Sequence, residues 1–304
     1  MSRASTQLAG VVLTIAVFAA ACSFPDSGGR GPVTYDPRPL SAALVTSAAD
    51  TIRLQEREES AVAACMVRRG LRYLPQRAVT SERAVTTNPY GLLREEQARQ
   101  DGYGAVGEII SGIGNRAPAA THHSGGWTKA LEGTHEEKLT LPTGMVLTYR
   151  PDGCAYQGRE EAYGRGWNRL ENELEGWQAL VMDRVEMNGL YANALSAWSA
   201  CMRESGYSYA DLQAPRQELA HRIEATGGQG KALRALGRKE LRIAADDYAC
   251  ERKARLHEAV YEAQRDIEHT VLNAAARADI RRYQKFKRTA LARGTGSVTS
   301  SAPF

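Results

Sequence analysis

Five cysteines are the residues of this 304-residue chain whose type and spacing point most directly to chemistry. Cys65, Cys154, Cys201 and Cys250 are spread widely, and Cys22 follows the only long apolar run. No cysteine has a cysteine or histidine partner at the short spacing typical of zinc ligands. Without Cys22 the set is even, as expected for disulfides in an oxidising compartment.

The start of the chain predicts export and lipidation. Leu8–Ala21 is an apolar run of 14 residues, too short to cross a membrane but typical of a signal peptide. It ends in A-A-A-C, which resembles a bacterial lipobox with Ala19 at the usual leucine position. We expect residues 1–21 to be removed and Cys22 to be lipidated, with secretion without a lipid as the alternative.

A short segment occurs twice in the chain. Residues 64–73 and 200–209 share the pattern A-C-M-x-x-x-G-x-x-Y without a gap. Apolar residues before each copy repeat every three or four positions, which predicts a helix. Gly70 and Gly206 fall where a left-handed residue would end that helix. Each cysteine is therefore expected in the last turn of a helix, facing the core.

The duplication favours one disulfide pairing over another. Each copy is followed by a further cysteine beside a charged helical run, Cys154 after the first and Cys250 after the second. The economical hypothesis is two bridged units, Cys65 to Cys154 and Cys201 to Cys250. The alternative, Cys65 to Cys201 with Cys154 to Cys250, would join the units to one another.

Two acidic doublets are the candidates for hydrolytic chemistry by residue type. A glycosidase acting on a wall polymer needs two carboxyl groups across a cleft. Glu160/Glu161 and Asp246/Asp247 are the pairs available. Acidic doublets are more often helix starts or solvated faces, and packing near Cys250 is a further alternative for Asp246/Asp247. We therefore predict no catalytic residue.

Other motifs give no support for a cofactor or metal. Residues 102–107 match G-x-G-x-x-G, but a charged helical stretch precedes them instead of the strand that a dinucleotide site requires. His122 and His123 have no third ligand at a fixed spacing. We expect neither a cofactor nor a bound metal.

The remaining patterns predict a mainly helical protein. A period near 3.6 from Leu256 to Ala278 predicts one long amphipathic helix, and Asn188-Gly189 predicts a break between helices. Residues 139–149 suggest a small β-hairpin inside a glycine-rich insertion. This insertion also contributes several aromatic side chains. They either pack in the core or form a surface that binds a ligand.

The fold expected is therefore two disulfide-bridged helical units. The first is expected over 46–166 with the glycine-rich insertion, and the second over 167–293 with the long helix. Residues 22–45, rich in proline, glycine and serine near their start, predict a flexible linker. The tail 294–304 is expected to be disordered.

Charge indicates which partners to expect. Without residues 1–21 the chain keeps 38 basic and 35 acidic side chains, a balance of +3 that does not indicate a nucleic-acid partner. Seven basic residues lie between Arg277 and Arg293, against the single acid Asp279. They are either a solvated helix end or a contact with anionic lipid or wall polymer.

These segments resemble a family of actinobacterial secreted proteins and lipoproteins of unknown function. The resemblance lies in W-x-x-C-M-x-x-x-G-Y-x-Y at Trp198–Tyr209, in an E-x-x-x-A-x-D-x-x-C-type segment ending at Cys250, and in residues 153–164. It implies a cysteine-bridged helical exported protein and no particular reaction.

We therefore expect a lipid-anchored, extracytoplasmic binding or accessory protein without catalytic activity. Its expected partners are the membrane, through the lipid on Cys22, and a membrane protein, cell-wall protein or wall polymer. The alternative is an envelope enzyme acting on peptidoglycan or another wall polymer.

Overall fold

The computed structural model describes residues 35–112, 124–227 and 229–293. The expected signal peptide, Cys22, the His122-His123 pair and the tail 294–304 lie outside the described residues. Within them the chain is mainly helical, as predicted, with a single small sheet. No helix in this part of the chain combines the length and apolarity that a membrane span requires.

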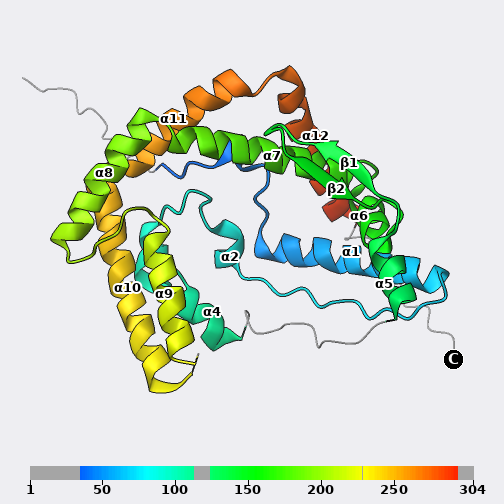
Figure 1. Cartoon of the computed structure of the whole chain (residues 1–304), viewed down its shortest axis with the longest axis horizontal. Helices are drawn as coiled ribbons and strands as arrows, with labels where there is room; N and C mark the ends of the chain where they lie inside the picture. Colours follow the sequence, from blue (N-terminus) through cyan, green and yellow to red (C-terminus); the bar gives the residue numbers. More distant parts are fainter. Residues whose placement is uncertain (1–34, 113–123, 228, 294–304) are drawn as a thin grey trace, which may run out of the picture. The chain divides into compact units, whose positions relative to one another are not determined.

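The described elements follow one another along the chain as labelled in Figure 1. They are η1 (Pro39–Ala42), α1 (Ala48–Arg68), α2 (Glu82–Thr86), α3 (Glu95–Gln100), α4 (Ala105–Ser111), α5 (Gly125–Glu132), β1 (Glu137–Thr140), β2 (Val146–Tyr149), α6 (Cys154–Tyr163), α7 (Trp167–Glu186), α8 (Gly189–Glu204), α9 (Ala214–Ala225), α10 (Gly230–Lys253), α11 (Leu256–Val271) and α12 (Ala274–Arg293).

Both copies of the repeated segment end a helix in the predicted way. Gly70 after α1 and Gly206 after α8 adopt left-handed backbone, with φ of +73° and +90°. The amide after each glycine donates to a methionine carbonyl, Leu71 to Met66 at 3.0 Å and Tyr207 to Met202 at 2.9 Å. This is the Schellman arrangement, in which glycine avoids the steric cost of positive φ.

The predicted break and hairpin are also confirmed. Asn188 separates α7 from α8, and its side-chain oxygen accepts from the Leu190 amide at 2.8 Å, as an N-cap does. Strands β1 and β2 pair antiparallel with Leu139 opposite Leu147. Gly144, with φ of +84°, lies in the turn that joins them.

The prediction of one long helix from Leu256 to Ala278 is wrong. Helix α11 ends at Val271, Leu272 is extended, and α12 begins at Ala274. Leu272 is 4% exposed within a buried cluster, and the Asn273 side chain accepts from the Ala276 amide at 2.9 Å. Asn273 thus acts as the N-cap of a new helix. The apolar residues keep their helical spacing across this break, which is why the pattern predicted one helix.

Two large buried clusters draw on distant parts of the sequence. The larger combines residues 90–106 with α8, α10 and α11, around the fully buried Trp198 and Met202. The second combines residues 40–54 with α6, α7 and α12, where Trp167 stacks on Tyr283 with ring centroids 4.4 Å apart. Both clusters cross the boundary expected between residues 166 and 167.

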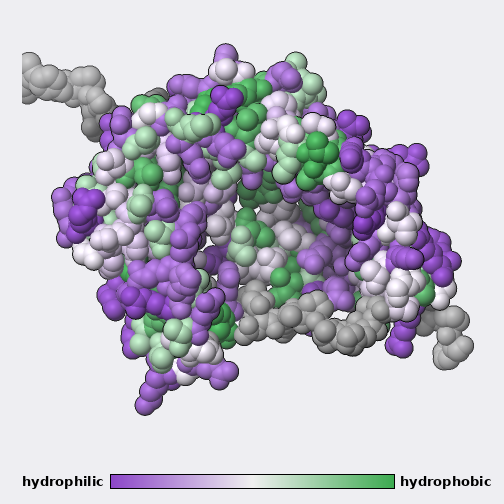
Figure 2. All heavy atoms as spheres, in the orientation of Figure 1, coloured by the Kyte–Doolittle hydropathy of each residue, from purple (hydrophilic) through white to green (hydrophobic). Residues whose placement is uncertain are grey.

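Helix α10 receives contacts from several elements. It packs on α3 and α4, which precede it by more than a hundred residues, and on α8 and α9; α9 lies beside it in Figure 1. On the face shown in Figure 2, hydrophilic and apolar residues are interspersed. The buried residues of α10 include three acids, Glu240, Asp247 and Glu251.

Candidate functional site

The four predicted disulfide cysteines form the expected pairs. Cys65 in α1 bonds to Cys154 at the start of α6, and Cys201 in α8 bonds to Cys250 in α10, each with Cα atoms 5.5 Å apart. The bridges span 89 and 49 residues of sequence. Paired cysteines of this kind are typical of oxidising, extracytoplasmic compartments.

The first acidic doublet has a structural role. Glu160, half-buried in α6, accepts from the Asn168 amide and side-chain nitrogen, each at 2.9 Å, and from the Gly166 amide. It thereby satisfies amide groups at the start of α7 that have no partner within that helix. Glu161 is exposed beside Arg68, at 3.6 Å. The two carboxylates therefore do not form a pair across a cleft.

The second doublet divides in the same way. Asp247 is fully buried, and it accepts from the Tyr103 hydroxyl at 2.6 Å and the Trp198 indole at 2.7 Å. Burial raises its pKa, while these two donors favour the ionised form. Asp246 is half-buried and accepts from the Tyr207 hydroxyl at 3.1 Å. Asp247, on the same helix as Cys250, is therefore a buried carboxylate with hydrogen-bond partners, and Asp246 is the more accessible member of the doublet.

A second buried carboxylate, Glu251, lies one turn beyond Asp247 on α10. It accepts from the Leu93 amide at 3.0 Å and contacts His257 Nε2 at 2.7 Å. Nδ1 of His257 lies 2.9 Å from the Tyr35 carbonyl, which can only accept, so Nδ1 carries a proton. Glu251 and Nε2 consequently share one further proton between them.

The pKa values of Glu251 and His257 are both raised, for different reasons. Burial raises the pKa of Glu251 to about 7, against the effect of the His257 and Leu93 bonds. Burial alone would lower the pKa of His257, but the adjacent carboxylate raises it. The buried position excludes a substrate, because Glu251 is 0% exposed and no reacting group could reach it. This pair therefore functions as part of the packing.

The same network holds the chain segment that leads toward Cys22, here called the anchor-side segment (residues 35–45). Gln264 donates to the Arg38 carbonyl at 2.9 Å, and Glu268 accepts from the Leu40 amide at 2.8 Å. Lys287 donates to the Ala43 carbonyl at 3.0 Å, and burial lowers its pKa to about 8. Helices α11 and α12 thus bind the anchor-side segment through its backbone.

The G-x-G-x-x-G stretch forms a turn that is filled by another carboxylate. Gly102 and Gly104 have positive φ, and helix α3 rather than a strand precedes them. Glu240, 2% exposed, accepts from the Ala105 amide at 2.7 Å and the Val106 amide at 3.0 Å. A protein carboxylate therefore occupies the amides that a phosphate would use in a dinucleotide site.

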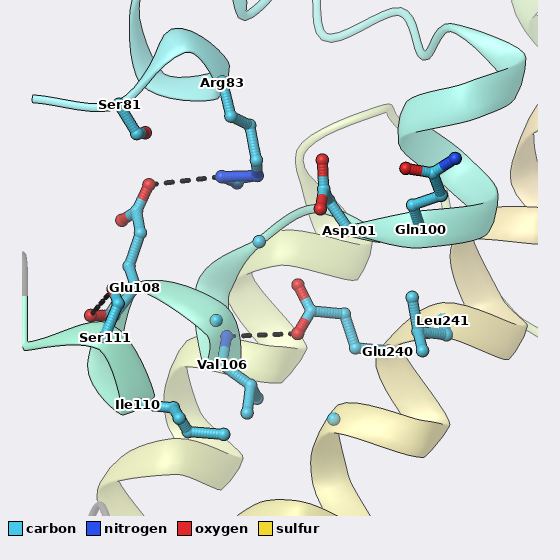
Figure 3. A pocket seen from close by; sticks show the side chains of 13 residues that line it. Ser81, Arg83, Gln100, Asp101, Val106, Glu108, Ile110, Ser111, Glu240 and Leu241 are labelled. Carbon is cyan, nitrogen blue, oxygen red and sulfur yellow. Dashed lines mark hydrogen bonds and ion pairs between the residues drawn. The ribbon is translucent and has the colours of Figure 1, made fainter.

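A cavity of about 380 Å³ lies between α2, α4 and α10 (Figure 3). Its wall includes Val106, Leu241 and the largely exposed Ile110. Arg83 and Glu108 form an ion pair at 3.2 Å beside it, while Glu240 faces α4. Glu108 and Glu240 therefore already have partners, and Asp101 is the other carboxylate that lines the cavity.

The aromatic residues of the insertion do not share one surface. Tyr103 and Tyr163 are buried in different clusters, whereas Tyr149 stacks on Tyr156 with centroids 5.5 Å apart. Trp127 instead stacks on Tyr73 at 6.0 Å. This distribution assigns the aromatic side chains to local packing at separate places.

Sequence reasoning did not assign a buried, hydrogen-bonded role to Glu240, Glu251 or His257. A signal for the first two exists, since Glu240, Asp247 and Glu251 are spaced by seven and four residues along the buried stripe of α10. Acids at core positions of a helix indicate buried hydrogen-bonded carboxylates. Their partners, however, come from residues 93–106, which only the fold brings near α10.

Within the described ranges, no group of three or more histidine, cysteine or acidic side chains is placed to hold a metal ion. No protein-family model, curated protein or solved structure matches the chain.

Proposed function

We propose that this chain is a lipid-anchored, extracytoplasmic binding or accessory protein of the cell envelope. A lipid on Cys22 holds it to the outer face of the cell membrane, and the folded part contacts a membrane protein, a wall protein or a wall polymer. The proposal includes membership of the secreted actinobacterial family that the cysteine segments resemble. No catalytic activity is part of it.

The cysteine arrangement is the observation that carries this proposal. Both bridges use the four cysteines of the folded part, so Cys22 has no disulfide partner within the chain. An exported protein with an odd cysteine requires a use for the remaining thiol. Lipidation after a run of small residues supplies that use.

The anchor-side segment supports a role as a tethered protein. Its backbone carbonyls at Arg38, Ala43 and Val45 accept from side chains of α11 and α12, at 2.7 to 3.0 Å. Because α11 and α12 both hold this segment, a pull on the anchor would act on a buried cluster and not on a loosely attached terminus. Such fixation suits a protein that must keep its surface near the membrane.

The acidic groups support a binding role over the enzyme alternative. Asp247 and Glu251 are fully buried, and Glu160 caps α7, so these carboxylates hold elements in place. Glu161 and Asp246 are the accessible members of the two doublets. An envelope enzyme that used either doublet would have to rely on these two.

The experiment is cross-linking in intact cells, followed by mass spectrometry of the attached molecules. Cys22→Ala is the unanchored control, and Glu161→Gln with Asp246→Asn tests the enzyme alternative. We expect capture of one membrane or wall protein that Cys22→Ala abolishes and the double acid variant retains. Accumulation of uncleaved wall polymer in the acid variant, without any protein captured by the parent chain, would contradict the proposal.

A further inference from the structure

One side of α12 carries four positive charges. Arg277, Arg281, Lys285 and Arg288 are exposed and separated by four, four and three residues, so they lie on one side of the helix. The buried residues Ala276, Tyr283 and Ala290 lie on the opposite side. We call these four cations the α12 basic face.

Acidic residues near this face do not neutralise it. Asp279 is the only acid in α12 and is half-buried outside the face. None of the four cations forms an ion pair with an acid of the described residues. Arg277 donates to the carbonyls of Leu272 and Glu268 and is also attracted to the half-buried Glu268 carboxylate, so the three cations without a described acidic partner are Arg281, Lys285 and Arg288. A face of this kind attracts an anionic surface.

The position of α12 relates this face to the anchor. Leu40 and Ala43 of the anchor-side segment share a buried cluster with α12, and Lys287 binds the carbonyls of Ala43 and Val45. Only twelve residues, 23–34, separate Cys22 from this segment. At about 3.5 Å per residue they span at most ~40 Å, so an anchor at Cys22 would limit how far the segment can lie from the bilayer.

We propose that the α12 basic face docks on the anionic phospholipid headgroups of the membrane that holds Cys22. This inference rests on the proposed function, because the anchor supplies the nearby bilayer. Cations on a helix near an anionic membrane surface add an electrostatic attraction to that of the lipid anchor. Among the described residues, the large exposed apolar side chains are spread over separate segments between α1 and α11. None of them lies in α12, so the proposed contact is electrostatic.

Helix α10 offers a matched control. Its exposed residues Arg234, Arg238 and Arg242 are also spaced by four and form no ion pair with a described acid. However, α10 packs mainly on α3, α4, α8 and α9 rather than on the anchor-side segment. Reversing three charges therefore changes the net charge by the same amount on either helix. The α12 variant alters the proposed docking face, whereas the α10 variant leaves it intact.

The test is vesicle flotation with the chain from residue 22 onward, carrying Cys22→Ala so that no lipid contributes. Vesicles of phosphatidylcholine with phosphatidylglycerol are compared with pure phosphatidylcholine. We expect binding to the anionic vesicles only, weakened by added salt. The variant Arg281→Glu/Lys285→Glu/Arg288→Glu should lower partitioning by more than about 100-fold, since losing each cation near the surface costs about a factor of five and each introduced glutamate adds repulsion.

The control and the contrary results are equally specific. Arg234→Glu/Arg238→Glu/Arg242→Glu should lower partitioning by about threefold or less, because charges beyond the screening length contribute little. Circular dichroism and melting temperature establish that each variant folds, and Arg281→Gln/Lys285→Gln/Arg288→Gln should give an intermediate loss. Equal losses in the α10 and α12 variants would overturn the proposal.

Two further outcomes separate the lipid surface from the other sources of binding. Loss of binding to isolated cell walls, with vesicle binding unchanged in the α12 variant, would overturn the proposal in favour of a wall polymer. Vesicle binding as expected by a chain whose Cys22 proves unlipidated in cells would uphold the α12 face while refuting the anchoring. These outcomes distinguish a failure of the α12 docking face from a failure of the anchoring.

Discussion

In both bridged regions, the tyrosine of the repeated segment reaches a glutamate on a helix. Tyr73 donates to Glu59 at 2.9 Å in the first region, and Tyr209 donates to Glu218 at 2.6 Å in the second. The surroundings of the bridges differ. Cys65–Cys154 lies in a cluster with only three other buried residues, whereas Cys250 belongs to the largest cluster, beside buried carboxylates.

This difference shows how the same local segment can serve two kinds of core. The first bridge joins α1 to α6, where Gly158 allows close approach: a Cβ there would lie 2.5 Å from Val62 Cγ2. The second bridge joins helices that already share extensive apolar contact and hydrogen-bonded acids. A small core depends on its covalent link, while a large one has other sources of stability.

Removing each bridge should have the largest effect and distinguish the two regions. In the chain-entropy treatment, Cys65→Ala/Cys154→Ala and Cys201→Ala/Cys250→Ala each cost about 4 to 5 kcal/mol of unfolding free energy. We expect the first variant to open α5, α6 and the hairpin locally, and the second to destabilise the whole molecule. Hydrogen exchange monitored by mass spectrometry measures both, and uniform protection loss in the first variant would contradict the distinction.

Removing a buried carboxylate should cost more free energy of unfolding than removing a half-buried one. Asp247→Ala leaves the Tyr103 hydroxyl and the Trp198 indole without their acceptor, at a cost of about 3 kcal/mol. Glu160→Ala removes a cap of α7 and should cost about 1 kcal/mol. Urea unfolding of both variants tests the difference, and equal midpoint shifts would show that burial does not distinguish them.

The second region should also govern the dependence of stability on pH. Burial raises the pKa of Glu251 from 4.5 to about 7, and the pKa of His257 is raised as well. The folded state therefore binds more protons than the unfolded chain, and stability falls as pH rises from about 4.5 through 7. We expect a loss of about 3 kcal/mol in the free energy of unfolding over this range.

The matched variant for this prediction is Glu251→Gln, which should flatten the slope between pH 5 and pH 8 in thermal unfolding. Lys287 acts in the opposite direction at higher pH. Burial lowers its pKa from 10.5 to about 8, so its contribution to stability rises with pH above 8. A parent chain that becomes steadily more stable between pH 5 and pH 7 would refute the assignment.

The smallest expected effect tests the similarity of the two copies. Gly70→Ala and Gly206→Ala place a Cβ in open space but at positive φ, so each should cost about 1 kcal/mol. Equal shifts in melting temperature would support the shared helix ending. A shift confined to one glycine would mean that the two segments are alike in sequence only.

Local features were predictable from the sequence because neighbouring residues determine them. Gly70, Gly206 and Asn188 end or start helices through their own backbone and side-chain preferences. The duplication also favoured the correct cysteine pairs over the alternative. The break at Leu272 was not predictable from periodicity, because the apolar stripe continues across Asn273.

Long-range packing was beyond the reach of these patterns. The acids on α10 accept from donors in residues 93–106. Helix α12 packs mainly on α6 and α7, which lie far from it in the sequence. Such contacts depend on which elements meet in space. Periodicity identifies a buried face but not the element that covers it.

The most direct test of the central claim is the intact mass of the protein extracted from cell membranes, with thiol alkylation before and after reduction. We predict a chain that begins at a lipidated Cys22, takes up no alkyl group before reduction and takes up four afterwards, one at each bridged cysteine. A chain without lipid on Cys22, or one alkylated at Cys65 or Cys250 before reduction, would contradict the account.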